Sequence, residues 1–359
     1  MTTAGSAGVI SQKTRVATTG MLRLLALLFS AACLLALLLV VTGHSPGRAF
    51  VAMFDGAFGS WYQFVSVTLV RAVPLALTGL AVAVAFRAGI LNIGAEGQLL
   101  AGAAAAAALA TVLGNASAFV ALPLLLFAGG VVGALWASVA AWLRRRFGVL
   151  EVISTIMLNF VALNLVGFLV RGPLQEPLGI YPQSPTLPGS LQLPILIPGT
   201  RLHVGVLVAI AASLALRHWL SNYASGFRVR SIGQNVHAAA TTGQIDVARV
   251  GFDVFILSGA LAGLAGVVEY TGVTYALYEN LSPGYGYTAI AVALLARLNM
   301  LAILGTALLF GALDAGANSM QRDANVPNVV VNVVYAGLIL LVLVADRWRE
   351  RQDIAERGT

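Results

Sequence analysis

The feature that most constrains this chain is a succession of apolar runs, most of them about 20 residues long, the length of α-helix that crosses the hydrocarbon core of a bilayer. Only 10% of the 359 residues are charged, whereas a soluble domain carries about 25%. We therefore predict an all-α integral membrane protein with about ten transmembrane helices. The ten runs are Leu22–Val41, Phe64–Phe86, Leu99–Gly114, Ala118–Leu143, Val149–Val170, His203–Leu220, Gly251–Val273, Ala289–Ala296, Ala302–Ala317 and Asn328–Val344.

The basic residues predict how these runs are oriented. If the N-terminus lies in the cytoplasm, sixteen of the 21 Lys and Arg side chains fall on that side, and Arg71 lies within a run. Basic residues favour cytoplasmic connections, so both termini are expected inside. One transmembrane domain, 22–345, would then separate tails at 1–21 and 346–359. The basic residues on the outer side are Arg48, Arg171, Arg201 and Arg322.

Several activities are excluded by residue type. Lys13 is the only lysine and follows Gln12, so the chain has no phosphate-binding Gly-Lys-Ser/Thr loop, and ATP could be hydrolysed only by another subunit. The four histidines are scattered and Cys33 stands alone, which supports neither a metal site nor an internal disulfide. No nucleophile–base or paired-carboxylate constellation is present, and the arginines between the apolar runs indicate orientation, not nucleic-acid binding. We predict a protein that is not an enzyme.

Two connections differ from the short polar turns. The outer loop 171–201 holds seven of the twelve prolines, which favours an extended, stiff segment. The cytoplasmic segment 221–250 is the most polar stretch in the middle of the chain. Ala289–Ala296 is too short to cross a membrane alone, so it is expected to begin in the preceding loop; whether it spans or re-enters the membrane stays open.

The segment Arg87–Gln98 places polar side chains and three glycines between two apolar runs. Glycines let a backbone leave helical geometry, and at membrane depth such backbone survives only when protein buries it or a cavity wets it. Arg87 and Glu96 would cost about 3 kcal/mol each unless paired, with each other or across a subunit interface. An ordinary cytoplasmic turn is the alternative. The polar candidates here are Arg87, Asn92, Glu96 and Gln98.

The segment Arg230–Ile245 predicts a short cytoplasmic helix. Asn235 is a favourable N-cap and Gly243 a favourable C-terminal stop, with about two turns of helix over Val236–Thr242 between them. The small Ala238, Ala239 and Ala240 suit docking into a groove of a partner, and a bulky charged residue at Ala239 should abolish such docking. A solvated connection is the alternative.

Other intramembrane features carry weaker signals. Arg71, near Pro74, and Glu269 lie within apolar runs, so they should face a cavity or a partner charge. Glu151, Asp253 and Asp314 lie near the ends of runs, where solvation accounts for them. Gly259-Ala-Leu-Ala-Gly263 is a pattern of small residues typical of helix packing.

The chain also contains an internal similarity. Thr78–Ala103 aligned on Thr288–Leu313 matches at eight of 26 positions, among them Arg87 with Arg297. Such repeats occur in many transporters, so the similarity predicts an internal duplication. The abundance of alanine and leucine raises the number of matches.

The stretch Arg71–Gln98 resembles the signature of bacterial ABC-importer permeases for nucleosides and simple sugars, within a larger group that also handles branched-chain amino acids. Ser231–Ile245 is similar to the cytoplasmic coupling segment of that family, and Ala289–Asn299 with Phe310–Leu313 also fits. Asn92–Gln98 points to the nucleoside-type branch. Where such permeases usually read Gly-Arg-Leu-Asn-Pro, this chain reads Ala296-Arg-Leu-Asn-Met300.

The resemblance implies a bacterial plasma-membrane permease for a nucleoside or simple sugar, with branched-chain amino acids as the alternative substrate. It implies three partners: an ATPase subunit with two nucleotide-binding domains that uses ATP and Mg²⁺, a second homologous permease, and a periplasmic or lipoprotein substrate-binding protein. The coupling residues would be Arg230, Gly233, Asn235, Ala238, Ala239, Ala240 and Gly243. The residues near the translocation path would be Arg71, Arg87, Asn92, Glu96, Gln98, Glu269 and Arg297.

A stand-alone ion- or proton-coupled secondary transporter is the rival interpretation, because repeats and intramembrane charges suit it equally well. The long capped cytoplasmic segment argues against it, since a transporter that works alone needs no docking helix. A structural scaffold is disfavoured, because scaffolds have little use for polar broken helices at membrane depth.

Overall fold

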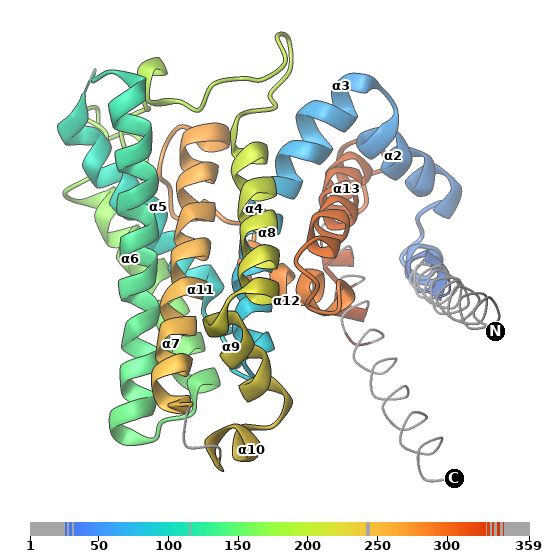
Figure 1. Ribbon diagram of the computed structural model, residues 1–359. Coiled ribbons are helices and arrows are strands. Elements are labelled where there is room, and N and C mark those ends of the chain that lie inside the picture. The colour runs from blue at the N-terminus through green and yellow to red at the C-terminus, as the bar shows by residue number, and fades with distance from the viewer. Residues whose placement is uncertain are drawn as a thin grey trace, which may run out of the picture. The chain divides into compact units, whose positions relative to one another are not determined.

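The computed structural model describes residues 26, 29–30, 32–114, 116–241, 245–327, 329–330, 332–333, 336–337 and 340, and in this part of the chain it forms helices joined by loops, without a sheet. Figure 1 shows these helices. In chain order the elements are α2 (Pro46–Phe58), α3 (Trp61–Gln63), the π-helical η1 (Phe64–Leu69), α4 (Val70–Arg87), α5 (Ala95–Leu113), α6 (Ala118–Phe147), α7 (Glu151–Arg171), the short 3₁₀ turn η2 (Gly189–Leu191), α8 (Gly205–Asn222), α9 (Ala224–Gln234), α10 (Val236–Thr241), α11 (Val247–Glu269), the π-helical η3 (Tyr270–Thr274), α12 (Tyr285–Leu295) and α13 (Ala302–Asp323).

Six of the described helices are long and apolar enough to cross a membrane. The predicted all-helical fold is therefore confirmed. The apolar helices Ala32–Val41 and Tyr285–Leu295 are shorter, and most of the predicted last run, Asn328–Val344, lies outside the described residues, as do both predicted tails. The six long helices are Trp61–Arg87, Ala95–Leu113, Ala118–Phe147, Glu151–Arg171, Val247–Thr274 and Ala302–Asp323.

Close helix packing in the core depends on glycine. Helix α11 packs mainly against α6, α5 and α4. A Cβ on Gly263 would overlap the carbonyl oxygen of Gly129 on α6, and a Cβ on Gly259 would overlap that of Gly133. The backbones of α6 and α11 thus touch where no side chain separates them, which is the packing role predicted for the small-residue pattern of α11.

Two π-helical segments interrupt otherwise continuous helices. Segment η1 joins α3 to α4 within the continuous helix Trp61–Arg87, and η3 extends α11 to Thr274. Segment η1 ends two residues before Arg71, and η3 begins directly after Glu269. Single π-helical turns are rare and are frequently found at functional sites.

The proline-rich loop that follows α7 contains turns, bends and the short η2, and it pairs with the segment after η3. The backbone N–H of Ser184 donates to the carbonyl of Leu277 at 2.8 Å, and that of Leu187 donates to the carbonyl of Tyr275 at 2.7 Å. In the same loop, Gln183 and the backbone N–H of Tyr181 donate hydrogen bonds to Glu176, which lowers the pKa of that carboxyl. The loop is thus held to its neighbour by main-chain bonds.

The chain divides into two compact units, one formed by residues 57–315 and the other by residues 1–56 with 316–359. The larger unit contains the helices that carry the candidate site. Within the smaller unit, Leu39 and Ala49 are buried, and Nε2 of His44 lies 3.1 Å from the carbonyl oxygen of Asn325.

Candidate functional site

The predicted broken element contains an irregular, non-helical stretch, residues 88–94, between α4 and α5. Gly89 takes a φ of +72°, a left-handed conformation that favours glycine. The side-chain amide of Asn92 is 0% exposed and holds this stretch in place. Its Oδ1 accepts a hydrogen bond from the backbone N–H of Gly94 at 2.9 Å. Its Nδ2 donates to Ser258 Oγ at 2.9 Å and to Gln98 Oε1 at 3.1 Å. Inside the helix bundle, these polar side chains therefore provide one another's hydrogen-bond partners.

This element reaches the middle of the bundle. Ser258 lies halfway along α11, and its hydroxyl donates to the carbonyl of Ala81, near the midpoint of α4, at 2.7 Å. Asn92 contacts that same hydroxyl. The stretch is therefore packed inside the bundle and is not a solvated surface turn, because Asn92 contacts Ser258 of α11, whose hydroxyl in turn bonds to α4.

Asn159 of α7 is a second buried amide in this network, and the sequence analysis missed it. It is 2% exposed; its Oδ1 accepts from the backbone N–H of Gly97 at 2.8 Å, and its Nδ2 donates to the carbonyl of Ile93 at 3.0 Å. Nδ2 also lies 3.3 Å from the hydroxyl of Tyr287. The signal in the sequence was an asparagine inside an apolar run, where a polar side chain needs a partner.

Glu96 caps a helix that begins inside the bundle. One of its carboxyl oxygens accepts from the backbone N–H of Gly286, in the first turn of α12, at 2.7 Å. A negative charge is favourable at a helix N-terminus, where the first N–H groups lack partners. The suggested pairing of Arg87 with Glu96 is wrong within this chain: Nε of Arg87 donates instead to the carbonyl of Leu298 at 3.0 Å.

The break after α12 resembles the break after α4. Both halves of the predicted repeat consist of a helix that ends near an arginine, a short irregular stretch and a second helix. Arg297 itself is exposed with a φ of +51°, and it is the next residue, Leu298, that receives the hydrogen bond from Arg87. The two breaks therefore contact each other.

Arg71 forms an ion pair with Asp314 of α13. The expectation that Asp314 is simply solvated is therefore wrong, because a charge within a span gains most from a partner of opposite sign. Glu269 lies close enough to both to interact electrostatically, is 3% exposed and leaves its Oε2 without a hydrogen-bond partner in the described part of the chain. Arg71 and Glu269 thus share one cluster, apart from the Asn92 network.

The predicted coupling helix is α10, and Asn235 is its N-cap. The side chain of Asn235 accepts from the backbone N–H of Ala238 at 3.0 Å. Ala238 and Ala240 are exposed, but Ala239 is 5% exposed and faces the protein, because neighbouring residues of a helix point in different directions. The small surface is therefore made by two alanines, and Gly243 lies outside the described residues.

The segment that precedes α10 touches the broken element directly. A Cβ on Gly233, in the last turn of α9, would overlap the carbonyl oxygen of Arg87, so only glycine allows this approach. Arg230 of α9 is near enough to Arg87 to interact electrostatically. Two of the predicted coupling residues, Gly233 and Arg230, thus lie beside the end of α4.

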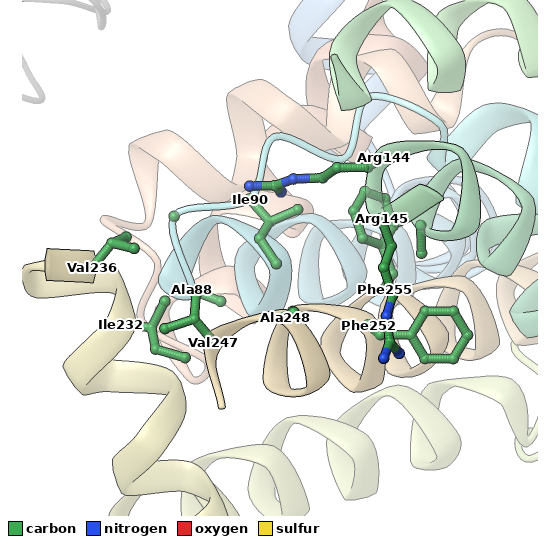
Figure 2. A pocket seen from close by; sticks show the side chains of 13 residues that line it. Ala88, Ile90, Arg144, Arg145, Ile232, Val236, Val247, Ala248, Phe252 and Phe255 are labelled. Carbon is green, nitrogen blue, oxygen red and sulfur yellow. The ribbon is translucent and has the colours of Figure 1, made fainter. Parts of the chain in front are cut away.

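A cavity of about 370 Å³ lies beside this contact. Figure 2 shows Ile232 of α9 and Val236 at the start of α10 on one side, with Ala88 and Ile90 of the broken element close by. Phe252 and Phe255 of α11 line it further along, and Arg144 and Arg145 come from the end of α6. The lining is mostly apolar, so α9 and α10 are not fully packed against the bundle here.

A buried histidine stands in the loop before α8. His203 is 1% exposed and packs against Gly272 of η3. Among the described residues, no three His, Cys, Asp or Glu side chains gather as metal ligands.

The chain is similar to membrane permeases over most of its length. The family model described as branched-chain amino acid transport system / permease component matches residues 64–343. A glucose ABC transporter permease protein of Haloferax volcanii is 37% identical over 88% of this chain and 85% of its own length. A guanosine ABC transporter permease protein of Bacillus subtilis is 37% identical over 86% and 88%, and a second guanosine permease protein of that organism is 28% identical over 80% and 92%. No solved structure matches.

Proposed function

Because this chain belongs to the family of branched-chain amino acid transport system permease components, we propose that it forms the translocation path of an ATP-driven importer for a nucleoside or a simple sugar. It is a multi-pass membrane protein and a transport subunit, as its relatives are. The relatives with 37% identity carry guanosine and glucose in their names, and these neutral polar solutes define the proposed substrate class.

The proposed mechanism rests on one contact, in which Gly233 of α9 touches the main chain of Arg87 at the start of the broken element. A displacement of α9 and α10 would push directly on a stretch whose other end, at Asn92, lies between the midpoints of α4 and α11. Coupling between distant sites requires an element with two arrangements that both sites can bias. The broken element is suited to this because its backbone is not locked in a helix.

The driving subunit is proposed to be a separate ATPase with two nucleotide-binding domains, which binds ATP and Mg²⁺. The exposed Ala238 and Ala240, flanked by Arg230, would enter a groove on that subunit. The cavity behind Ile232 and Val236 leaves α10 room to shift when it is pulled. This chain has no phosphate-binding loop of its own, since its single lysine lacks the required neighbours.

The second permease is proposed to be a homologous chain and not a copy of this one. Bacillus subtilis has two guanosine permease proteins that match this chain at 37% and 28% identity, and such a pair is what a heterodimeric permease requires. A substrate-binding lipoprotein or periplasmic protein would deliver the solute to the outer face, which the proline-rich loop would line.

The proposed topology has ten spans and both termini in the cytoplasm of a bacterial cell, with the protein in the plasma membrane. The distribution of arginines supports this orientation. It places α9 and α10, together with the breaks after α4 and α12, on the cytoplasmic side, where an ATPase subunit works.

The test is uptake in cells that express the complete transporter. Ala238→Arg should reduce uptake to less than a tenth of the wild-type rate without loss of protein from the membrane, because a long cation on α10 blocks docking. Ala224→Arg, also an exposed alanine but at the start of α9, is the matched control and should transport normally. Normal uptake by the Ala238 variant would contradict the coupling role.

Uptake that survives ATP depletion but stops when the proton gradient collapses would favour a secondary transporter.

A further inference from the structure

Glu269 is a buried carboxyl group that the protein leaves partly unsatisfied. It is 3% exposed, and within the described residues its Oε2 has no hydrogen-bond partner. Glu96 is also buried, but it accepts a hydrogen bond from Gly286. A polar group buried without a partner is costly, so an unpartnered acceptor at membrane depth indicates that another molecule supplies the donor during function.

The surroundings of Glu269 are suited to a polar ligand. Arg71 of α4, Asp314 of α13 and Tyr285 of α12 all interact with it electrostatically, as does Tyr278 of the loop before α12. The side chains of Arg71 and Asp314 remain 29% and 22% exposed, so the cluster borders accessible space. The two π-helical segments η1 and η3 lie directly beside this cluster.

Arg71, the cation within this cluster, is already paired, which restricts the ligand. Arg71 pairs with Asp314, and the positive end of α12 is capped by Glu96. Arg201 also interacts electrostatically with Glu269, but it is exposed and donates to the carbonyl of Val273. A zwitterionic amino acid would require a cation left over for its carboxylate, and the cluster does not offer a buried one.

We propose that Glu269 is a substrate-binding residue that accepts a hydrogen bond from a hydroxyl or N–H group of an uncharged solute as it passes the Arg71–Asp314 pair. The inference rests on the proposed import function, and it identifies Oε2 of Glu269 as the protein atom that recognises the substrate. It also selects neutral polyols and nucleosides over branched-chain amino acids, because a neutral donor needs only the free Oε2.

The experiment measures ATP-driven uptake by the complete transporter with guanosine and with analogues that each lack one donor, namely 2′-deoxyguanosine, 3′-deoxyguanosine and inosine. If the wild type imports glucose in place of guanosine, the monodeoxy glucoses serve in the same way. The variants are Glu269→Ala and the isosteric Glu269→Gln. The control is Glu279→Gln, whose carboxyl pairs with Arg171 and is 39% exposed.

Glu269→Ala should raise the KM for the full substrate at least tenfold, and Glu269→Gln should raise it less, because an amide oxygen still accepts a hydrogen bond. One analogue should lack the donor that Glu269 recognises. For that analogue, the KM values of the wild type and of Glu269→Ala should be nearly equal. Glu279→Gln should behave as the wild type does.

A uniform loss of maximal rate for all analogues, with unchanged KM, would overturn the inference and leave Glu269 a structural role. An unchanged KM in Glu269→Ala would overturn it as well. If the wild-type transporter imports neither nucleosides nor sugars, the proposed substrate class itself is wrong, and this outcome is distinct from a failure of the Glu269 variants alone.

Discussion

Nε of Arg87, at the end of α4, donates a hydrogen bond to the main-chain carbonyl of Leu298, 211 residues later in the chain, at 3.0 Å. Leu298 directly follows Arg297, the residue that corresponds to Arg87 in the internal repeat. The bond therefore joins the two places at which a helix is interrupted, one in each half of the repeat. It gives the two breaks a fixed mutual position on the side of the bundle that also carries α9 and α10.

Replacing Arg87 should loosen both breaks. Arg87→Gln removes the Nε donor, and a hydrogen bond from a charged group contributes about 2 kcal/mol, so the melting temperature of the purified protein in detergent should fall by several degrees. Arg217→Gln, which removes an exposed arginine of α8, should melt as the wild type does. Equal melting of all three proteins would show that the Arg87–Leu298 bond does not stabilise the fold.

Gly233→Ala should separate α9 from the broken element, because its Cβ would overlap the Arg87 carbonyl oxygen. We expect less than a tenth of wild-type uptake with normal amounts of protein in the membrane. Gly305→Ala is the matched control: this helical glycine of α13 is exposed and has no neighbour within 4 Å of an added Cβ. A Gly233→Ala variant that transports at the wild-type rate would disprove the importance of the close approach.

Asn92→Ala should destabilise the protein strongly. It leaves the backbone N–H of Gly94, the Gln98 side chain and Ser258 without the partner they have now, and each unsatisfied buried group costs about 1–3 kcal/mol. Asn222→Ala, an exposed asparagine next to His218, should change stability by about 0.5 kcal/mol or less. Thermal melting in one detergent compares the two, and similar melting temperatures would contradict the proposed role of the buried network.

The sequence predicted the fold class because the length of the apolar runs depends only on neighbouring residues. It also located the cap of α10 at Asn235 and the break between α4 and α5, since caps and glycine-rich breaks are local signals. It did not reveal that Ala239 turns inward, because the direction of one side chain on a two-turn helix depends on what that helix packs against.

The sequence alone does not show which residues are the partners of the buried polar side chains. Asp314 lies 243 residues from Arg71, and nothing local marks either as the partner of the other. Asn159 and Ser258 become part of the Asn92 network only when α7 and α11 pack against the broken element. Such pairings follow from tertiary structure, and periodicity alone does not encode them.

The proposed import function requires that this chain works with an ATPase. The most direct measurement is purification of the tagged protein from its native host in mild detergent, with identification of the co-purifying subunits. We predict an ATPase in near-stoichiometric amount together with a second, non-identical permease. A protein that purifies alone and monodisperse, without an ATPase, would contradict the proposed import function and would leave α9 and α10 without their proposed partner.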